Sequence, residues 1–141
     1  MIEDHILKGR CLCGAVTVTV PAPDRKLRAC HCDMCQQHTS GIYFSILTDQ
    51  EGMEVTGPAT TFRSSHWAER AFCSTCGSTL WYGTVDDGAR HLSAGLFPNA
   101  GNGKLVIEFY SDERPDGYKL GGDQRRLNRE ETIALFTGEE T

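Results

Sequence analysis

Hydrophobic and polar residues alternate in short runs along most of the chain, and turn-forming residues separate the runs. In AVTVTV (15–20) every second residue is valine, the pattern of a strand with one buried face. Comparable runs are GIYFSIL (41–47), MEVTG (53–57), ATTFRSS (59–65), STLWYG (78–83), KLVIEFY (104–110) and, after a hairpin-like turn, HLSAGLF (91–97). This spacing of strands and turns predicts a mainly β protein.

Helical periodicity is weak by comparison. The clearest helix candidate is NREETIALF (128–136), where Asn128 is placed to cap the first turn and Glu131 follows three residues later. This arrangement is a capping box, in which the two side chains and two backbone amides satisfy one another. Short helical turns are also expected around residues 33–39. The prediction is therefore a β fold with few, short helices.

Length and charge narrow the choice of function. The 141 residues correspond to one domain, and 14 basic against 19 acidic residues give a net charge of -5. Nucleic-acid binding needs a basic face, so no nucleic-acid partner is expected. No apolar run has the length of a signal peptide or of a membrane span, so no membrane partner is expected and the predicted location is the cytoplasm. In that reducing compartment, grouped cysteines are metal ligands more often than disulfides.

The seven cysteines fall into three groups. GRCLCG contains Cys11 and Cys13, ACHCDMC contains Cys30, Cys32 and Cys35, and FCSTCGS contains Cys73 and Cys76. On an extended segment, C-x-C directs both sulfurs to one side, whereas C-x-x-C wraps a tight turn around a metal ion. Gly77 follows the C-x-x-C pair, where such turns often need a positive φ.

Four thiolates and three thiolates predict two different metal sites. Cys11, Cys13, Cys73 and Cys76 would make a closed tetrahedral site, which is the structural type. The Cys30, Cys32 and Cys35 group would then leave one coordination position open, which is the catalytic type. In a second partition, the two C-x-x-C pairs bind one ion as a zinc ribbon, and Cys11, Cys13 and Cys30 form the other group. The spacing of the cysteines does not by itself decide between the two partitions.

Three neighbouring residues add detail to these sites. His31 lies between Cys30 and Cys32, so in an extended segment its ring faces away from the sulfurs, and a supporting or packing role is expected. His38, three residues after Cys35, is a less favoured candidate for a fourth ligand or a base at the three-cysteine site. On a straight strand, Cys11 and Cys13 would face one side of the sheet and the valines at 16, 18 and 20 the other. Gly14 is a candidate for a β-bulge, which would bring the cysteines and the valines to the same side.

The motifs GRCLCGAVTVTV, CHCDMCQQHTSG and FRSSHWAERAFCSTCGSTLW, in this order, resemble the glutathione-dependent formaldehyde-activating enzymes, a family that includes centromere protein V. The resemblance covers all seven cysteines. It implies a single zinc-binding β-tent domain over residues 1–141, built of small antiparallel sheets around zinc. It also implies two zinc ions per chain, a structural one on Cys11, Cys13, Cys73 and Cys76 and a catalytic one on Cys30, Cys32 and Cys35. The C-terminal stretch ERPDGYKLGGD (113–123) departs from the family pattern.

The resemblance further implies a carbon–sulfur lyase that joins glutathione to formaldehyde, with a small-molecule thiol and an aldehyde as partners. Arg63 and Arg70 are candidate contacts for the glutathione carboxylates, because arginine binds a carboxylate with two parallel hydrogen bonds. Two alternatives are a non-catalytic zinc module that binds another protein and a redox sensor whose cysteines release zinc on oxidation.

Overall fold

The computed structural model describes residues 5–137, and strands dominate this range. One antiparallel sheet has the order β1 (Ile6–Arg10), β2 (Thr17–Pro21) and β5 (Glu54–Thr56). A second antiparallel sheet has the order β6 (Ala59–Arg63), β7 (Ala68–Cys73), β8 (Thr79–Thr84) and β9 (Arg90–Leu92). The third has the order β11 (Arg125–Arg126), β10 (Lys104–Phe109), β3 (Lys26–Cys30) and β4 (Tyr43–Ile46), with β10 and β11 parallel.

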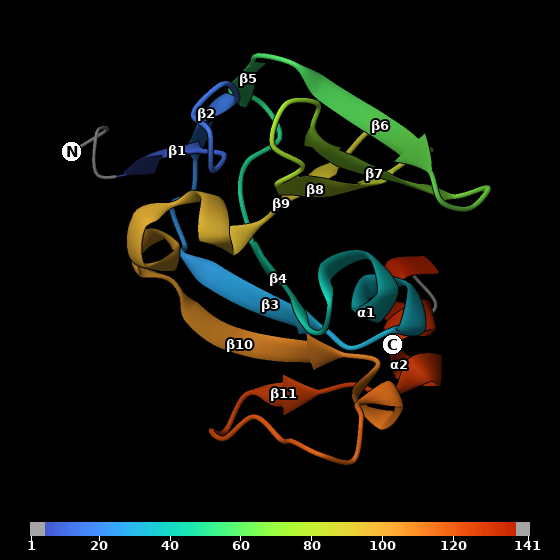
Figure 1. The fold of residues 1–141 in the computed structure, drawn as a ribbon. Coiled ribbons are helices and arrows are strands. Elements are labelled where there is room, and N and C mark those ends of the chain that lie inside the picture. Colours follow the sequence, from blue (N-terminus) through green and yellow to red (C-terminus); the bar gives the residue numbers. More distant parts are fainter. Residues whose placement is uncertain (1–4, 138–141) are drawn as a thin grey trace. The chain divides into compact units, whose positions relative to one another are not determined.

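The helices are few and short. Within residues 5–137 the α-helices are α1 (Asp33–Thr39) and α2 (Arg129–Thr137). Short 3₁₀ segments lie at Ala94–Leu96, Ser111–Glu113 and Pro98–Asn102, the last with left-handed backbone at residues 99–101. The fold is therefore mainly β with small, mostly antiparallel sheets, as predicted (Figure 1). No helix in this range is long and apolar enough to cross a membrane.

The predicted capping box at the start of α2 is confirmed. The Glu131 amide donates a 2.8 Å hydrogen bond to Asn128 Oδ1, and the Asn128 amide donates a 3.0 Å bond to Glu131 Oε1. The strand predicted in HLSAGLF was too long. The strand ends at Leu92, Ser93 forms an isolated antiparallel bridge with Ser45, and the chain then turns into the 3₁₀ segment Ala94–Leu96.

Four strands lacked a clear signal in the sequence. They are β1, β3, β7 and β11. The strand β7 contains the charged pair Glu69 and Arg70, yet it pairs with a neighbour on each side. Backbone pairing on both edges therefore outweighs the low strand propensity of its charged side chains.

The described residues form two compact units. One unit takes in the described part of Met1–Lys26 and Ser45–Lys104, and the other takes in Leu27–Phe44 and the described part of Leu105–Thr141. Each unit is thus assembled from two separate stretches of chain. The four-cysteine set lies entirely in the first unit and the three-cysteine set entirely in the second.

Each unit has its own buried apolar residues. In the first unit the predicted alternation of residues 15–20 places three valines inside, each at most 1% exposed: Val16 just before β2, and Val18 and Val20 on β2. Leu80 on β8 and Leu92 on β9 are fully buried in the same unit. In the second unit the buried set includes Ala29, Tyr43, Phe109 and Leu127.

Candidate metal centres

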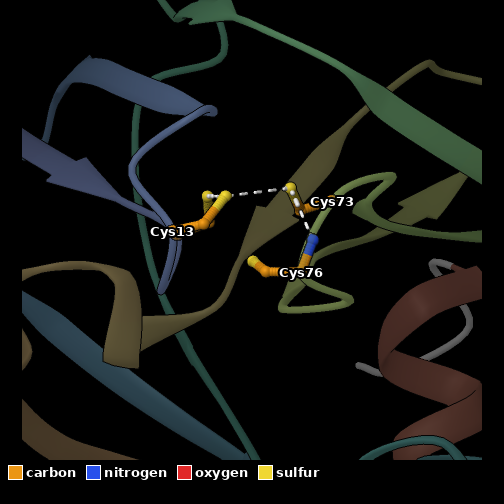
Figure 2. A group of neighbouring side chains, drawn as sticks. Cys13, Cys73 and Cys76 are labelled. Carbon is orange, nitrogen blue, oxygen red and sulfur yellow. Dashed lines mark hydrogen bonds between the residues drawn. The ribbon is translucent and has the colours of Figure 1, made fainter.

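Four cysteine sulfurs converge in the first unit. Cys11 and Cys13 lie in the turn after β1, Cys73 ends β7, and Cys76 lies in the turn that leads to β8. Their sulfur atoms all lie within 4.8 Å of one another. Figure 2 shows the side chains of Cys13, Cys73 and Cys76 directed toward one another from two segments of the chain.

The expectation that Cys11 and Cys13 lie on an extended strand was wrong. The chain turns at this point, because the Gly14 amide donates to the Cys11 carbonyl at 3.1 Å and the Cys11 amide donates to the Val16 carbonyl at 3.0 Å. Gly14 therefore belongs to a turn and not to a strand bulge. Because of this turn, the alternation of a strand does not continue from the cysteines to the valines. The sulfurs therefore need not face away from the valine side chains, as they would on one straight strand.

Backbone amides surround the four-cysteine group and point at its sulfurs. The Val16 amide donates to Cys11 Sγ at 3.3 Å, and the Ala15 amide donates to Cys13 Sγ at 3.4 Å. The amides of Thr75 and Cys76 both donate to Cys73 Sγ at 3.4 Å. Such donors favour the thiolate, which is the form of cysteine that binds metal. Gly77 has a φ of +79°, as its place after the C-x-x-C pair predicted.

The sulfur spacings fit a tetrahedral metal ion and exclude a disulfide. The Sγ–Sγ distances are 3.6 Å for Cys11 and Cys13 and 3.8 Å for Cys13 and Cys73. A disulfide bond is about 2.05 Å long. Zinc–sulfur bonds of about 2.3 Å in tetrahedral geometry place the sulfurs about 3.8 Å apart. The four residues therefore fit zinc in both spacing and donor type.

The thiols of this group differ in acidity because their neighbours differ. The hydroxyl and amide of Ser78 lower the pKa of Cys76 to about 5. The Ala15 amide lowers the pKa of Cys13, but burial and the three other cysteines outweigh that effect and raise the pKa of this thiol to about 11. The neighbouring sulfurs thus disfavour the thiolate of Cys13, and a bound cation would favour it.

The second unit gathers the other three sulfurs. Cys30 is the last residue of β3, Cys32 is the N-cap of α1, and Cys35 lies in its first turn. The three sulfurs lie within 4.8 Å of one another, and among residues 5–137 no histidine or carboxylate joins them as a further ligand. Cys32 and Cys35 are 8% and 3% exposed, whereas Cys30 is half-buried.

Three close sulfurs also disfavour several negative charges in this group. Hydrogen bonds with Cys32 and Cys35, together with burial, raise the pKa of the Cys30 thiol far above its ordinary value. The Cys35 amide donates to Cys32 Sγ at 3.4 Å, so the turn between these two cysteines already supports one thiolate. An all-sulfur set of this kind suits a soft or borderline metal such as zinc.

A buried hydrogen bond joins the three-cysteine segment to β10. His31 is fully buried, and its Nε2 lies 2.7 Å from Oε1 of Glu108 on β10. Burial raises the pKa of Glu108, but hydrogen bonds from Gln124 and His31 and the charge of Arg126 outweigh it and leave the pKa below its ordinary value. Glu108 escaped the sequence analysis, and its one signal was an acidic residue within the apolar run KLVIEFY.

Neither predicted arginine belongs to a cysteine group in the described residues, and the two have different surroundings. Arg63, at the exposed end of β6, donates from Nε to the Ser65 carbonyl at 2.8 Å and from Nη2 to the His66 carbonyl at 2.9 Å. Arg70, on β7, is 2% exposed, and its guanidinium lies 4.7 Å from the centre of the Tyr82 ring. The role of both residues as carboxylate contacts stays a prediction.

An open hollow of about 400 Å³ lies beside α1 in the second unit. It is lined by Thr39, Ser40, Gly41, Ile42, Phe44 and Tyr118. Tyr118 belongs to the stretch 113–123, and it is 40% exposed. The hollow is therefore bordered by a residue from the part of the sequence that departs from the family pattern.

Comparisons with known proteins bear on both cysteine groups. The profile of the family described as glutathione-dependent formaldehyde-activating enzyme matches residues 6–113, a range that includes all seven cysteines. An uncharacterized lyase of Schizosaccharomyces pombe is 29% identical over 128 residues, which cover 89% of this chain and 93% of that protein. The crystal structure of a Rhodobacter sphaeroides protein covers 86% of this chain and 100% of its own, with a TM-score of 0.54 and 17% identity. At that identity the likeness shows the fold alone.

Proposed function

This chain belongs to the glutathione-dependent formaldehyde-activating enzyme family, and we propose that it is a zinc-dependent carbon–sulfur lyase acting on the adduct of a thiol and a small aldehyde. The family match confirms the resemblance that the cysteine motifs predicted, and the relative named as a lyase supports lyase-type chemistry. In the synthetic direction, the sulfur of glutathione would bond to the carbonyl carbon of formaldehyde or a similar aldehyde. The thiol proton would end on the carbonyl oxygen.

The three-cysteine group is the observation that carries this proposal. Its sulfurs lie close enough to share one ion, and among the described residues it has three members and not four. Three protein ligands and one exchangeable position are the pattern of catalytic zinc, whereas four cysteines are the pattern of structural zinc. We therefore assign Cys30, Cys32 and Cys35 to a catalytic ion and Cys11, Cys13, Cys73 and Cys76 to a structural ion.

Zinc at the open site would supply a deprotonated thiol and a polarised carbonyl oxygen. The chain's own residues hold the three sulfurs in place. Cys30 ends a strand and Cys32 begins a helix, so two regular elements fix the ends of the segment. The Cys35 amide supports Cys32 Sγ, and the Thr39 hydroxyl donates to the Cys35 carbonyl at 2.8 Å.

Substrate contacts beyond the metal form a separate part of the proposal. Of the two predicted arginines, Arg63 is the exposed one, and we propose it as a contact for a thiol carboxylate. Arg70 stays a candidate, although its guanidinium is buried against Tyr82. We expect the enzyme to act in the cytoplasm, where its seven thiols stay reduced.

A cobalt-substituted protein tests the proposed function directly. Cobalt(II) takes tetrahedral thiolate sites and absorbs in the visible range, so glutathione is titrated into protein that carries two cobalt ions per chain. We expect a saturable change in the sulfur-to-metal bands, and we expect Cys32→Ser to abolish it. The matched control ligand is S-methylglutathione, which has the same charges but no free thiol.

Two outcomes would contradict the proposal. If glutathione leaves the spectrum of fully loaded protein unchanged, no thiol enters the open position. If S-methylglutathione causes the same change as glutathione, the ligand acts from outside the metal shell. A non-catalytic zinc module would then be the better interpretation. In the positive case, mixing the protein with glutathione and formaldehyde should accelerate formation of the adduct, followed by NMR.

A further inference from the structure

Glu108 is the centre of a buried hydrogen-bond network in the second unit. It is 2% exposed, and its Oε1 lies 2.7 Å from His31 Nε2. Its Oε2 accepts a 2.6 Å bond from Gln124 Nε2 and lies 3.0 Å from Arg126 Nε. An ionised carboxylate only accepts hydrogen bonds, so His31 must carry a proton on Nε2 and donate it to Glu108. Three donors thus compensate the buried negative charge.

The backbone of His31 is held as firmly as its ring. Its amide donates to the Phe109 carbonyl at 3.1 Å, and its carbonyl accepts a 2.7 Å bond from Gln36 Nε2. The same Gln36 nitrogen donates to the Glu113 carbonyl at 3.0 Å. The residue between Cys30 and Cys32 is therefore fixed through its amide, its carbonyl and its imidazole. Rotation of the chain at this position would move at least one of the two flanking sulfurs.

We propose that His31 and Glu108 form a positioning pair for the three-cysteine metal site and set its affinity for metal. The inference rests on the proposed function, because it requires an ion on Cys30, Cys32 and Cys35. A metal site needs ligand atoms held close to their bound geometry, and this pair fixes the residue that lies between two of the three ligands. Residues that orient metal ligands typically change metal affinity by roughly 10–100-fold when they are lost.

The four-cysteine group provides an internal reference for this proposal. Its sulfurs are supported by backbone amides of their own turns, and the described contacts of His31 and Glu108 do not involve them. Loss of the pair should therefore weaken one metal site and leave the other unchanged. A general loss of stability would not produce that selectivity.

The test is a cobalt titration against a competing chelator, which resolves the two sites of each folded chain by affinity and by their absorption bands. His31→Leu removes the hydrogen bond, and we expect the three-cysteine site to bind cobalt roughly 10–100-fold more weakly, with altered bands. Glu108→Gln keeps the shape of the side chain and should weaken the same site by a smaller factor. The double variant should be no weaker than His31→Leu, because two residues that act as one unit give non-additive effects.

Leu127→Val is the matched control. Leu127 is 1% exposed in the same unit, and the substitution removes one methylene from its apolar side chain. Its amide still donates to the Glu108 carbonyl and its carbonyl still accepts from the Ser111 amide, so this variant should bind cobalt like the wild type at both sites.

Several outcomes would overturn the inference. If both His31→Leu and Glu108→Gln bind cobalt at the three-cysteine site as tightly as the wild type, the pair only stabilises the core and does not position the metal ligands. Equal weakening in Leu127→Val would attribute the effect to lost stability, and multiplied effects in the double variant would show that the residues act independently. If the wild-type protein binds only one ion, the proposed function fails together with the inference. If it binds two and the variants match it, the inference alone fails.

Discussion

Gly57→Ala should be the most costly glycine substitution next to the four-cysteine group. Gly57 has a φ of +107°, and a Cβ atom there would lie 2.0 Å from the Ala15 carbonyl oxygen and 2.9 Å from Val16 Cα. The positive φ costs a non-glycine residue about 1–2 kcal/mol. Forcing extra volume into packed surroundings adds about 1–3 kcal/mol. Because the obstructing atoms are backbone, no side-chain rotation can relieve the clash.

The expected loss of unfolding free energy is therefore about 2–5 kcal/mol, a large share of the stability of an ordinary domain. Gly88→Ala is the matched control, because Gly88 has a φ of +68° and no heavy atom within 4 Å of its added Cβ. Gly88→Ala should lower the unfolding free energy only by the cost of the positive φ, about 1–2 kcal/mol. Urea unfolding of zinc-loaded protein at one fixed zinc concentration measures both values.

The same substitution should also loosen the metal. The Ala15 amide donates to Cys13 Sγ at 3.4 Å, so displacement of Ala15 weakens the support of that sulfur. Release of zinc to a chromogenic chelator should be faster in Gly57→Ala than in Gly88→Ala. Equal unfolding free energies for the two variants would refute the argument that the Ala15 turn has no room for a methyl group.

Three further predictions address the metal, the pH dependence and the substrate. Cys73→Ser should lower the zinc content by one ion per chain and reduce stability strongly, because structural zinc contributes folding energy; elemental analysis and urea unfolding check both. Hydrogen bonds from the Thr84 hydroxyl and the Ala89 amide lower the pKa of Asp87. The stability that the Asp87 carboxylate contributes is therefore fully present above its unfolded-state pKa of about 3.9, and it is lost as the pH falls through the lower pKa of the folded state. Because Asp87 is exposed and solvent screens its interactions, Asp87→Asn should lower the unfolding free energy by no more than about 0.5 kcal/mol, equally at about pH 7 and about pH 5.5 in urea unfolding. Arg63→Met should raise KM for glutathione without changing the zinc content, and an unchanged KM would remove Arg63 from the substrate site.

Local patterns accounted for much of what could be predicted. The capping box at Asn128 and Glu131 and the positive φ of Gly77 involve residues a few positions apart, so the sequence contains both partners of each interaction. The same holds for the alternation of apolar residues in β2. Such features depend on the period of a strand or a helix and on the stereochemistry of single residues.

Long-range pairing accounts for what the sequence did not reveal. His31 and Glu108 are 77 positions apart, and no local pattern connects an imidazole to a carboxylate at that separation. Strand pairing also places Arg70 beside Tyr82, where its guanidinium is buried over the ring, and no local pattern revealed this environment; its role as a ligand contact stays a prediction. The turn at Cys11 and Cys13 was missed because C-x-C fits an extended segment and a turn equally well.

The two cysteine groups differ in the origin of their support, and this difference has a consequence for their function. Sulfurs of the four-cysteine group accept hydrogen bonds from amides of Ala15, Val16, Thr75 and Cys76, which belong to the same turns as the cysteines. Substitution of side chains elsewhere leaves such amides in place, which suits a structural ion. In the three-cysteine segment the Cys35 amide likewise supports Cys32 Sγ, but in our proposal the segment is also held by His31 and, through Glu108, by Gln124 and Arg126. Side chains outside the cysteine motif would therefore adjust the geometry of the proposed catalytic ion while the proposed structural ion stays unchanged.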